Sequence, residues 1–337
     1  MMIKKLAVKN FKSIKDVALD CRRINVFIGE PNVGKSNLLE ALGLFSLPYF
    51  GDGTAFSRLI RFENFANVFR DADVGSPVSV TAEDERKARH DFSIAMENGH
   101  YNGVYKIEPV ASEAPVVLRF TANADSITTW SPTTGRYPVR YYRFEPRGVF
   151  DKKDGDFLAP FSGANLLFLM QTNPELHALA DGLFQSRGFR LVLRPHENKI
   201  EVQNAGEGRI VQFPYSSVSD TLKRYIFHLA ALRTNRDAVL IFEEPESHAF
   251  PFYTKQLAEE MALDARGNQF FVSTHNPYFL LPLVYKAPRE ELAVFLTSMS
   301  GHETRVVRLD DAQMRKLAEL DADVFFNFDR FLGSGER

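Results

Sequence analysis

Three short apolar runs along the chain predict its central architecture. Residues 239–242 (Val-Leu-Ile-Phe) and 270–272 (Phe-Phe-Val) are continuous apolar runs, and residues 24–28 (Ile-Asn-Val-Phe-Ile) are interrupted by one polar residue. Such runs are typical of strands buried on both faces, whereas a strand with one solvated face alternates apolar and polar residues. The pattern therefore predicts an α/β protein whose central sheet is covered on both faces.

The run at 239–242 leads directly into Glu243 and Glu244. Pro245 then ends the strand, because proline cannot donate a hydrogen bond to the sheet. Ligands of open α/β sheets bind at this carboxyl edge. Two adjacent carboxylates there would suit a bound metal or a water that is to be deprotonated. The alternative is a pair of solvated glutamates at a strand end.

A phosphate-binding motif follows the run at 24–28. It fits the P-loop pattern of Gly, four residues, then Gly-Lys-Ser, and apolar residues at helical spacing follow it at positions 38, 39, 42 and 45. Backbone N–H groups of such a loop and of the following helix bind phosphate oxygens. The expected nucleotide-binding residues are Gly29, Glu30, Pro31, Asn32, Val33, Gly34, Lys35, Ser36 and Asn37.

The P-loop gives the acidic strand end a chemical role. Lys35 is expected to contact the β- and γ-phosphates of ATP, and Ser36 with Glu243 is expected to hold Mg²⁺. Glu244 is then the candidate general base. His275 follows the run at 270–272 and is a candidate catalytic residue that hydrogen-bonds the γ-phosphate or the attacking water. The alternative for His275 is a polar residue with only a structural partner.

Composition narrows the class of protein. The chain has 337 residues, 45% of them hydrophobic, and a formal net charge of −2, which argues against a globally basic nucleic-acid binder. It has no apolar run long enough to span a membrane and no apolar leader at its N-terminus. A single cysteine, Cys21, excludes an internal disulfide. We therefore expect a cytoplasmic protein.

Four stretches together resemble the head of ABC-type ATPases, in particular the group of RecF, SMC and OLD (overcoming lysogenisation defect) proteins. MIKKLAVKNFKSIKDVAL at 2–19 is similar to that group's opening hairpin, whose Phe-Lys-Ser turn lies near the nucleotide. EEPESHAFP at 243–251 resembles its Walker B strand and D-loop, and STHNP at 273–277 resembles its switch-histidine motif. VSDTLKRYIFHLAAL at 218–232 stands where its signature helix stands.

The resemblance implies one ABC-type ATPase head over residues 1–337, with ATP and Mg²⁺ as cofactors. It implies an inserted, antiparallel, strand-rich lobe at 75–145 and a helical and signature region at 161–234, in which residues 161–184 are expected to form one helix. It also implies a head-to-head homodimer, in which ATP on one chain meets Ser219 of the other. The chain is too short after His275 for a separate TOPRIM nuclease domain, and we expect the acids at 310–311, 321 and 323 to lie on the surface.

The chain departs from the group's pattern at three places. Glu243 replaces the usual Walker B aspartate, and Thr221 stands where the signature has glycine. No glutamine occurs between Ser36 and Gln171, so the glutamine that usually helps to hold Mg²⁺ is missing from its expected position. Asn64 and Asn67 are candidate replacements.

Two functions remain open at this point. An intact ATPase without a nuclease domain suggests a regulator of a separately encoded effector, such as a TOPRIM-like nuclease, in antiphage defence. The alternative is a RecF-like DNA-repair clamp, and a transporter ATPase is disfavoured. Arginines interleaved with aromatic residues would suit DNA contact, or would only line a solvated strand face. They are Arg136, Arg140, Arg143 and Arg147.

Overall fold

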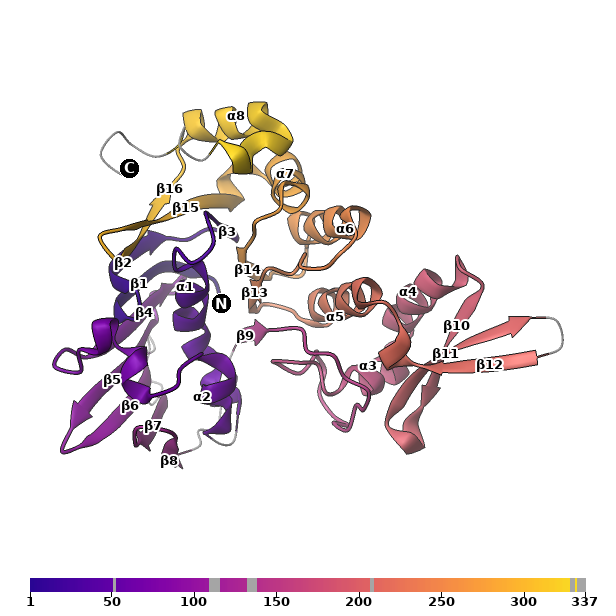
Figure 1. Cartoon of the computed structure of the whole chain (residues 1–337), viewed down its shortest axis with the longest axis horizontal. Coiled ribbons are helices and arrows are strands. Elements are labelled where there is room, and N and C mark those ends of the chain that lie inside the picture. The colour runs from indigo at the N-terminus through magenta and orange to yellow at the C-terminus, as the bar shows by residue number, and fades with distance from the viewer. Residues whose placement is uncertain (51–52, 109–115, 132–137, 207–208, 328–330, 332–337) are drawn as a thin grey trace.

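The structure is a computed structural model of the chain, and it describes all residues except 51–52, 109–115, 132–137, 207–208, 328–330 and 332–337. Its centre is a six-stranded sheet in the order β16-β15-β3-β14-β13-β9 (Figure 1). Neighbouring strands are parallel except for β15 and β16. The strands are β3 (Ile24–Ile28), β9 (Val139–Tyr142), β13 (Val239–Glu243), β14 (Gln269–Ser273), β15 (Leu292–Ser300) and β16 (Glu303–Arg308).

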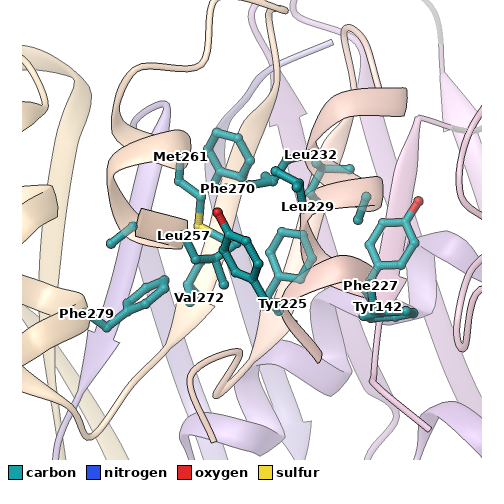
Figure 2. Packing of buried hydrophobic residues seen from close by; sticks show 14 of the residues in the cluster. Tyr142, Tyr225, Phe227, Leu229, Leu232, Leu257, Met261, Phe270, Val272 and Phe279 are labelled. Carbon is teal, nitrogen blue, oxygen red and sulfur yellow. The ribbon is translucent and has the colours of Figure 1, made fainter. Parts of the chain in front are cut away.

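The three apolar runs form β3, β13 and β14, which confirms the predicted central strands. Their side chains alternate between two separate cores. Leu240 and Phe242 of β13 lie in the core formed with α5 (Asp220–Thr234), α6 (Pro251–Ala262) and α7 (Pro277–Lys286). Figure 2 shows Leu229 of α5, Leu257 of α6 and Phe279 of α7 in this core. Val239 and Ile241 face the core on the other side, which contains α1 (Lys35–Gly43). Both faces of the sheet are thus covered, as a continuous apolar run requires.

The second core is closed by a seven-stranded antiparallel sheet in the order β2-β1-β4-β5-β6-β7-β8. Its strands are β1 (Ile3–Phe11), β2 (Ile14–Asp20), β4 (Val78–Asp84), β5 (Arg89–Glu97), β6 (His100–Glu108), β7 (Val116–Ala122) and β8 (Ile127–Ser131). The lobe expected at 75–145 therefore continues the N-terminal hairpin, because β4 pairs with β1. Its expected end is also different, since β9 pairs with β13 in the central sheet.

The region at 161–234 is not only helical, which corrects the prediction. It contains α3 (Leu166–Thr172), α4 (Pro174–Gln185) and a small antiparallel sheet of β10 (Phe189–Arg194), β11 (Lys199–Gly206) and β12 (Arg209–Pro214). The single helix expected at 161–184 is broken at Asn173, whose side chain caps α4 by accepting from the Leu176 N–H. The break follows from Pro174, because a proline disfavours helical backbone at the preceding residue.

The C-terminal part packs beside α7 (Figure 1). Helix α8 (Asp311–Leu320) begins with a capping box between Asp310 and Gln313, and Asp321 and Asp323 are exposed, as expected for surface acids. Within the described ranges, no three His, Cys, Asp or Glu side chains gather as a metal site, and no helix combines the length and apolarity needed to cross a membrane. The remaining helices are α2 (Thr54–Leu59) and short 3-10 turns at Leu44–Tyr49, Phe65–Val68, Arg70–Ala72, Pro195–Glu197, Tyr215–Ser217, Arg289–Glu291 and Asp321–Phe326.

Candidate nucleotide-binding site

A pocket of about 730 Å³ lies where β3, β13 and β14 end. The strands are parallel and in register, so their carboxyl ends place the P-loop, the glutamate pair and the histidine loop at one edge of the sheet. The residues that line this pocket are Lys12, Pro31, Asn32, Gly34, Lys35, Ser36, Asn37, Arg61, Arg143, Phe144, Arg224, His228, Glu243, Glu244, Ser247, His248 and His275.

The P-loop connects β3 to α1. Steric constraints explain why two of its positions are glycine. Gly29 and Gly34 have φ angles of 152° and 97°, which favour residues without a side chain. A Cβ atom on Gly29 would lie 2.1 Å from the carbonyl oxygen of Thr297, and one on Gly34 would lie 2.0 Å from Oγ1 of Thr304. Close packing against the C-terminal strands therefore fixes the loop in the shape that leaves the N-terminus of α1 facing the pocket.

Lys35 is held over the P-loop by hydrogen bonds. Its Nζ atom donates to the carbonyl oxygens of Gly29 at 3.0 Å and Glu30 at 2.7 Å. Burial lowers the pKa of Lys35 to about 8, against the opposing effect of nearby Glu244 and Glu243. A partly desolvated ammonium group at this place would be stabilised by a phosphate.

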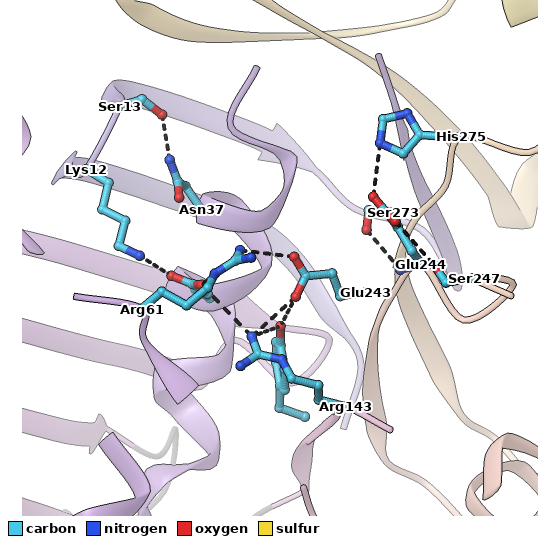
Figure 3. A network of polar contacts seen from close by, with 12 residues as sticks. Lys12, Ser13, Asn37, Arg61, Arg143, Glu243, Glu244, Ser247, Ser273 and His275 are labelled. Atoms are coloured by element: carbon cyan, nitrogen blue, oxygen red, sulfur yellow. Dashed lines mark hydrogen bonds and ion pairs between the residues drawn. The ribbon is translucent and has the colours of Figure 1, made fainter. Parts of the chain in front are cut away.

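Glu243 is the most heavily contacted carboxylate of the site (Figure 3). Oε1 accepts from Arg61 Nη2 at 3.0 Å, and Oε2 accepts from the Tyr141 hydroxyl at 3.0 Å and from Arg143 Nη2 at 3.2 Å. Burial alone would raise the pKa of Glu243, but the nearby Ser36 side chain and the two arginines outweigh it and hold the pKa below its ordinary value.

The Ser36 hydroxyl and the Glu243 carboxylate fit a Mg²⁺ ion by their chemistry. Both are oxygen donors, and a P-loop Mg²⁺ takes its other ligands from phosphate oxygens and water. Both residues line the same pocket. These are the residues that would hold the metal, with Glu243 already engaged by cationic side chains.

Glu244 and His275 form the second polar cluster of the site (Figure 3). His275 Nε2 lies 3.0 Å from Glu244 Oε1, and Ser247 Oγ donates to Oε2 at 3.2 Å. Glu244 has left the strand, with a φ of 43°, and its N–H donates to the carbonyl oxygen of Ser273 at 3.1 Å. The hydrogen bond from His275 lowers the pKa of Glu244 against the effect of burial, so the carboxylate is ionised at neutral pH.

A buried carboxyl group lies beneath this cluster. Glu246 is only 6% exposed, and its Oε1 accepts from the Thr274 hydroxyl at 2.5 Å and from the His275 N–H at 3.2 Å. Oε2 is buried without a hydrogen-bond partner among the described residues. Burial raises the pKa of Glu246 to about 7. Glu246 therefore connects the loop after β13 to the backbone that carries His275.

The hairpin turn between β1 and β2 also reaches the pocket. Lys12 lies against the fully buried Glu40 of α1, whose other oxygen accepts from Arg61 Nε at 2.6 Å. Ser13 Oγ accepts from the Asn37 side chain at 2.7 Å. The hairpin is thus fixed to the first turns of α1, which confirms the expected position of the Phe-Lys-Ser turn near the P-loop.

With this geometry in place, comparison with known proteins identifies the family. The model of the family described as "AAA domain, putative AbiEii toxin, Type IV TA system" matches residues 24–281. The chain belongs to this family of AAA domains. A stretch of 64 residues of the chain is also 38% identical to the DNA replication and repair protein RecF of Caldanaerobacter subterraneus subsp. tengcongensis (strain DSM 15242 / JCM 11007 / NBRC 100824 / MB4). That stretch is 19% of this chain and 18% of that protein, so it spans less than a fifth of the relative.

Solved structures of SMC heads share the fold of the AAA domain. The SMC head bound to the C-winged helix domain of ScpA has a TM-score of 0.54 at 15% identity and covers 94% of this chain and 100% of that chain. An SMC head with an extended coiled coil, bound to the C-terminal domain of ScpA and derived from Pyrococcus furiosus, has a TM-score of 0.50 at 14% identity, with 94% and 98% covered. The fold is therefore that of an ABC-type P-loop ATPase head.

The AAA domain places most of the predicted residues around one pocket. Pro31, Asn32, Gly34, Lys35, Ser36, Asn37, Glu243, Glu244 and His275 line it, whereas Gly29, Glu30 and Val33 shape the loop from behind. His275 contacts Glu244. Asn64 and Asn67 do not line the pocket, because they cap the 3-10 turn at Phe65–Val68.

Sequence reasoning missed Arg61 and Arg143 as pocket residues. Arg143 follows β9, and β9 is parallel to β13 with Tyr142 opposite Phe242. Arg143 and Glu243, which directly follow this pair, therefore lie side by side. The strand before Arg143 contains Arg140, so it gave no continuous apolar run, and Arg61 lies in an irregular loop that no pattern marks.

In the described part of the chain, the arginines of this stretch make contacts within the protein. Arg140 stacks on the Phe157 ring at 3.4 Å, and Arg143 binds Glu243. Arg147 donates to Ser162 Oγ at 2.7 Å. Arg136 lies outside the described residues.

The predicted signature serine lies away from its own pocket. Ser219 is exposed immediately before α5 and does not line the pocket of its own chain. Thr221, which stands in the glycine position, donates its hydroxyl to the carbonyl oxygen of His248 at 2.9 Å. The signature helix is thus linked to the loop that follows Glu244.

Proposed function

We propose that the AAA domain binds Mg·ATP in the P-loop pocket and hydrolyses it slowly, with Glu244 as the general base. The 3.0 Å contact between Glu244 Oε1 and His275 Nε2 at the pocket edge carries this proposal. A carboxylate oriented by a histidine, next to a loop that binds phosphates, is the arrangement needed to activate a water. The low pKa of Glu244 keeps it ready to accept a proton at neutral pH.

In this mechanism each residue has one task. Lys35 and the N–H groups at the start of α1 bind the phosphates, while Ser36 and Glu243 hold the metal. Mg²⁺, when bound, would supply positive charge to the phosphate oxygens. Glu244 accepts the proton of the attacking water, and His275 keeps the carboxylate in position and donates a hydrogen bond to it.

We also infer that ATP brings two copies together. Ser219 would contact the nucleotide of a second copy, because it is exposed and lies outside its own pocket. A ligand that bridges two chains favours the dimer by mass action. The Thr221 hydroxyl donates a hydrogen bond to the carbonyl oxygen of His248, so the dimer contact would be coupled to the loop that follows Glu244.

The proposed biological role is regulation or scaffolding of a separately encoded effector in antiphage defence, as in OLD-like systems. Two findings support it. The family description refers to a toxin of a Type IV TA system, and two SMC heads of similar fold carry a bound domain of a second protein, ScpA. A TOPRIM-like nuclease is the effector class that we propose.

The mass of the complex purified with the products of its neighbouring genes tests this role. It is measured with and without Mg·ATP, and Glu244→Gln is used to keep ATP bound. A complex that contains a second gene product supports the effector role. A bare dimer that forms only with ATP contradicts it and supports a RecF-like clamp, for which salt-dependent DNA binding is then measured.

A further inference from the structure

The pocket has more positive charge than its motifs explain. Among the described lining residues, Arg61 and Arg143 lie outside the P-loop, the strand end and the histidine loop. Both contact Glu243. The positively charged lining residues are Lys12, Lys35, Arg61, Arg143 and Arg224, against the carboxylates of Glu243 and Glu244.

Cationic donors already hold the Glu243 carboxylate. A carboxylate offers about four lone-pair positions. Three of them are occupied, since Arg61 binds Oε1, and Arg143 and the Tyr141 hydroxyl bind Oε2. A metal that uses Glu243, directly or through water, therefore competes with two guanidinium groups for the same carboxylate.

The two guanidinium groups would stay in the pocket even if their contacts with Glu243 were broken. Arg61 is anchored through Nε to the buried Glu40 at 2.6 Å. Arg143 is anchored through Nη1 to the carbonyl oxygen of Arg58 at 3.0 Å. The Nη2 atom of each arginine, which now binds Glu243, could therefore turn to a phosphate that enters the pocket, with or without a metal.

We propose that Arg61 and Arg143 are ligands of the triphosphate that compete with Mg²⁺ for Glu243, so that this pocket binds ATP without a divalent metal. This inference rests on the proposed function, because it assumes that the pocket binds ATP. Guanidinium groups suit the task, since they are permanently charged and their paired N–H groups match phosphate oxygens. The arginines would supply in the metal-free state the positive charge that Mg²⁺ supplies in the loaded state.

Calorimetric titration with a non-hydrolysable ATP analogue, in Mg²⁺ and in EDTA, tests the proposal. We expect the wild-type protein to bind the analogue under both conditions. The double variant Arg61→Ala/Arg143→Ala should lose about a hundredfold or more of its affinity in EDTA, the scale of two charge-assisted hydrogen bonds. Its affinity in Mg²⁺ should change by less than about tenfold, because Glu243 is then free for the metal.

Arg147→Ala is the matched control, because Arg147 is exposed to a similar extent, 26% against 28% for Arg143, but binds Ser162 outside the pocket. It should leave binding unchanged under both conditions. If the double variant does not fold, the single variant Arg143→Gln replaces it. This variant removes one charge but keeps hydrogen-bonding capacity, so it should weaken binding in EDTA more than in Mg²⁺.

Three results would overturn the inference. Wild-type binding in Mg²⁺ but not in EDTA contradicts metal-free binding and leaves the proposed function intact. An equal loss of affinity under both conditions in the double variant contradicts competition with the metal. If the wild-type protein binds the analogue under neither condition, both the proposed function and this inference are wrong.

Discussion

The backbone N–H of His275 donates a hydrogen bond to Oε1 of the buried Glu246, 3.2 Å away. The same oxygen accepts from the Thr274 hydroxyl, so one carboxyl group sets the backbone of the histidine loop. The histidine ring in turn contacts Glu244, the candidate base. Glu246 therefore positions the loop that carries His275, although it does not itself line the candidate nucleotide pocket.

This arrangement predicts a pH dependence of stability. Burial raises the pKa of Glu246 from 4.5 to about 7. The folded state then binds the proton more tightly than the unfolded state, so this contribution to stability is present below pH 4.5 and is lost as the pH rises through 7. The loss amounts to about 3 kcal/mol.

Glu246→Gln imitates the protonated carboxyl group and cannot ionise. Its free energy of unfolding relative to the wild-type protein should therefore increase as the pH rises from about 5 to about 7. Urea unfolding of both proteins at a series of pH values measures this difference. A difference that stays constant with pH would show that Glu246 does not titrate in this range.

We predict that the ionised Glu40 carboxylate stabilises the folded protein by pairing with cationic side chains beside the pocket. It is fully buried and is contacted by Lys12 and Arg61. Glu40→Gln leaves the largely buried Lys12 without a counter-charge, which should cost about 3 kcal/mol of stability. Glu145→Gln is the control, because Glu145 pairs with Arg58 on the surface and should change stability by less than about 1 kcal/mol. Equal effects in urea unfolding would contradict the anchoring role of Glu40.

Lys35→Ala should separate binding from stability. The Lys35 ammonium is buried, and burial lowers its pKa to about 8, so holding it charged costs stability in the folded protein. Its loss should leave the thermal unfolding temperature equal or higher, while the affinity for ATP falls by about a hundredfold or more. Lys255→Ala, on the exposed face of α6, serves as the control. Unfolding of Lys35→Ala at a lower temperature would assign Lys35 a structural role instead.

Much of the site could be predicted from the sequence because its signals are local. The P-loop and the glutamate pair each follow an apolar run, and the fold converts such runs into parallel strands whose ends meet. Arg61 and Arg143 could not be found in this way, since their partner Glu243 lies 182 and 100 residues away along the chain.

The errors also have physical causes. The arginine stretch left DNA contact and a solvated strand face as alternatives. Arg140, in β9 of the central sheet, packs on Phe157, and its charge is partly buried. The sheet of β10–β12 was missed because only a few of its apolar residues are buried and its outer strand β12 is exposed. The buried ones are Leu191, Ile200 and Val202.

The role of Glu244 in hydrolysis is the central claim. The most direct test measures phosphate release and bound ATP in the same sample, for the wild-type protein and for Glu244→Gln. We predict that Glu244→Gln retains ATP and releases phosphate about a hundredfold or more slowly, the effect of losing a general base. Phosphate release by Glu244→Gln at the wild-type rate would contradict the account.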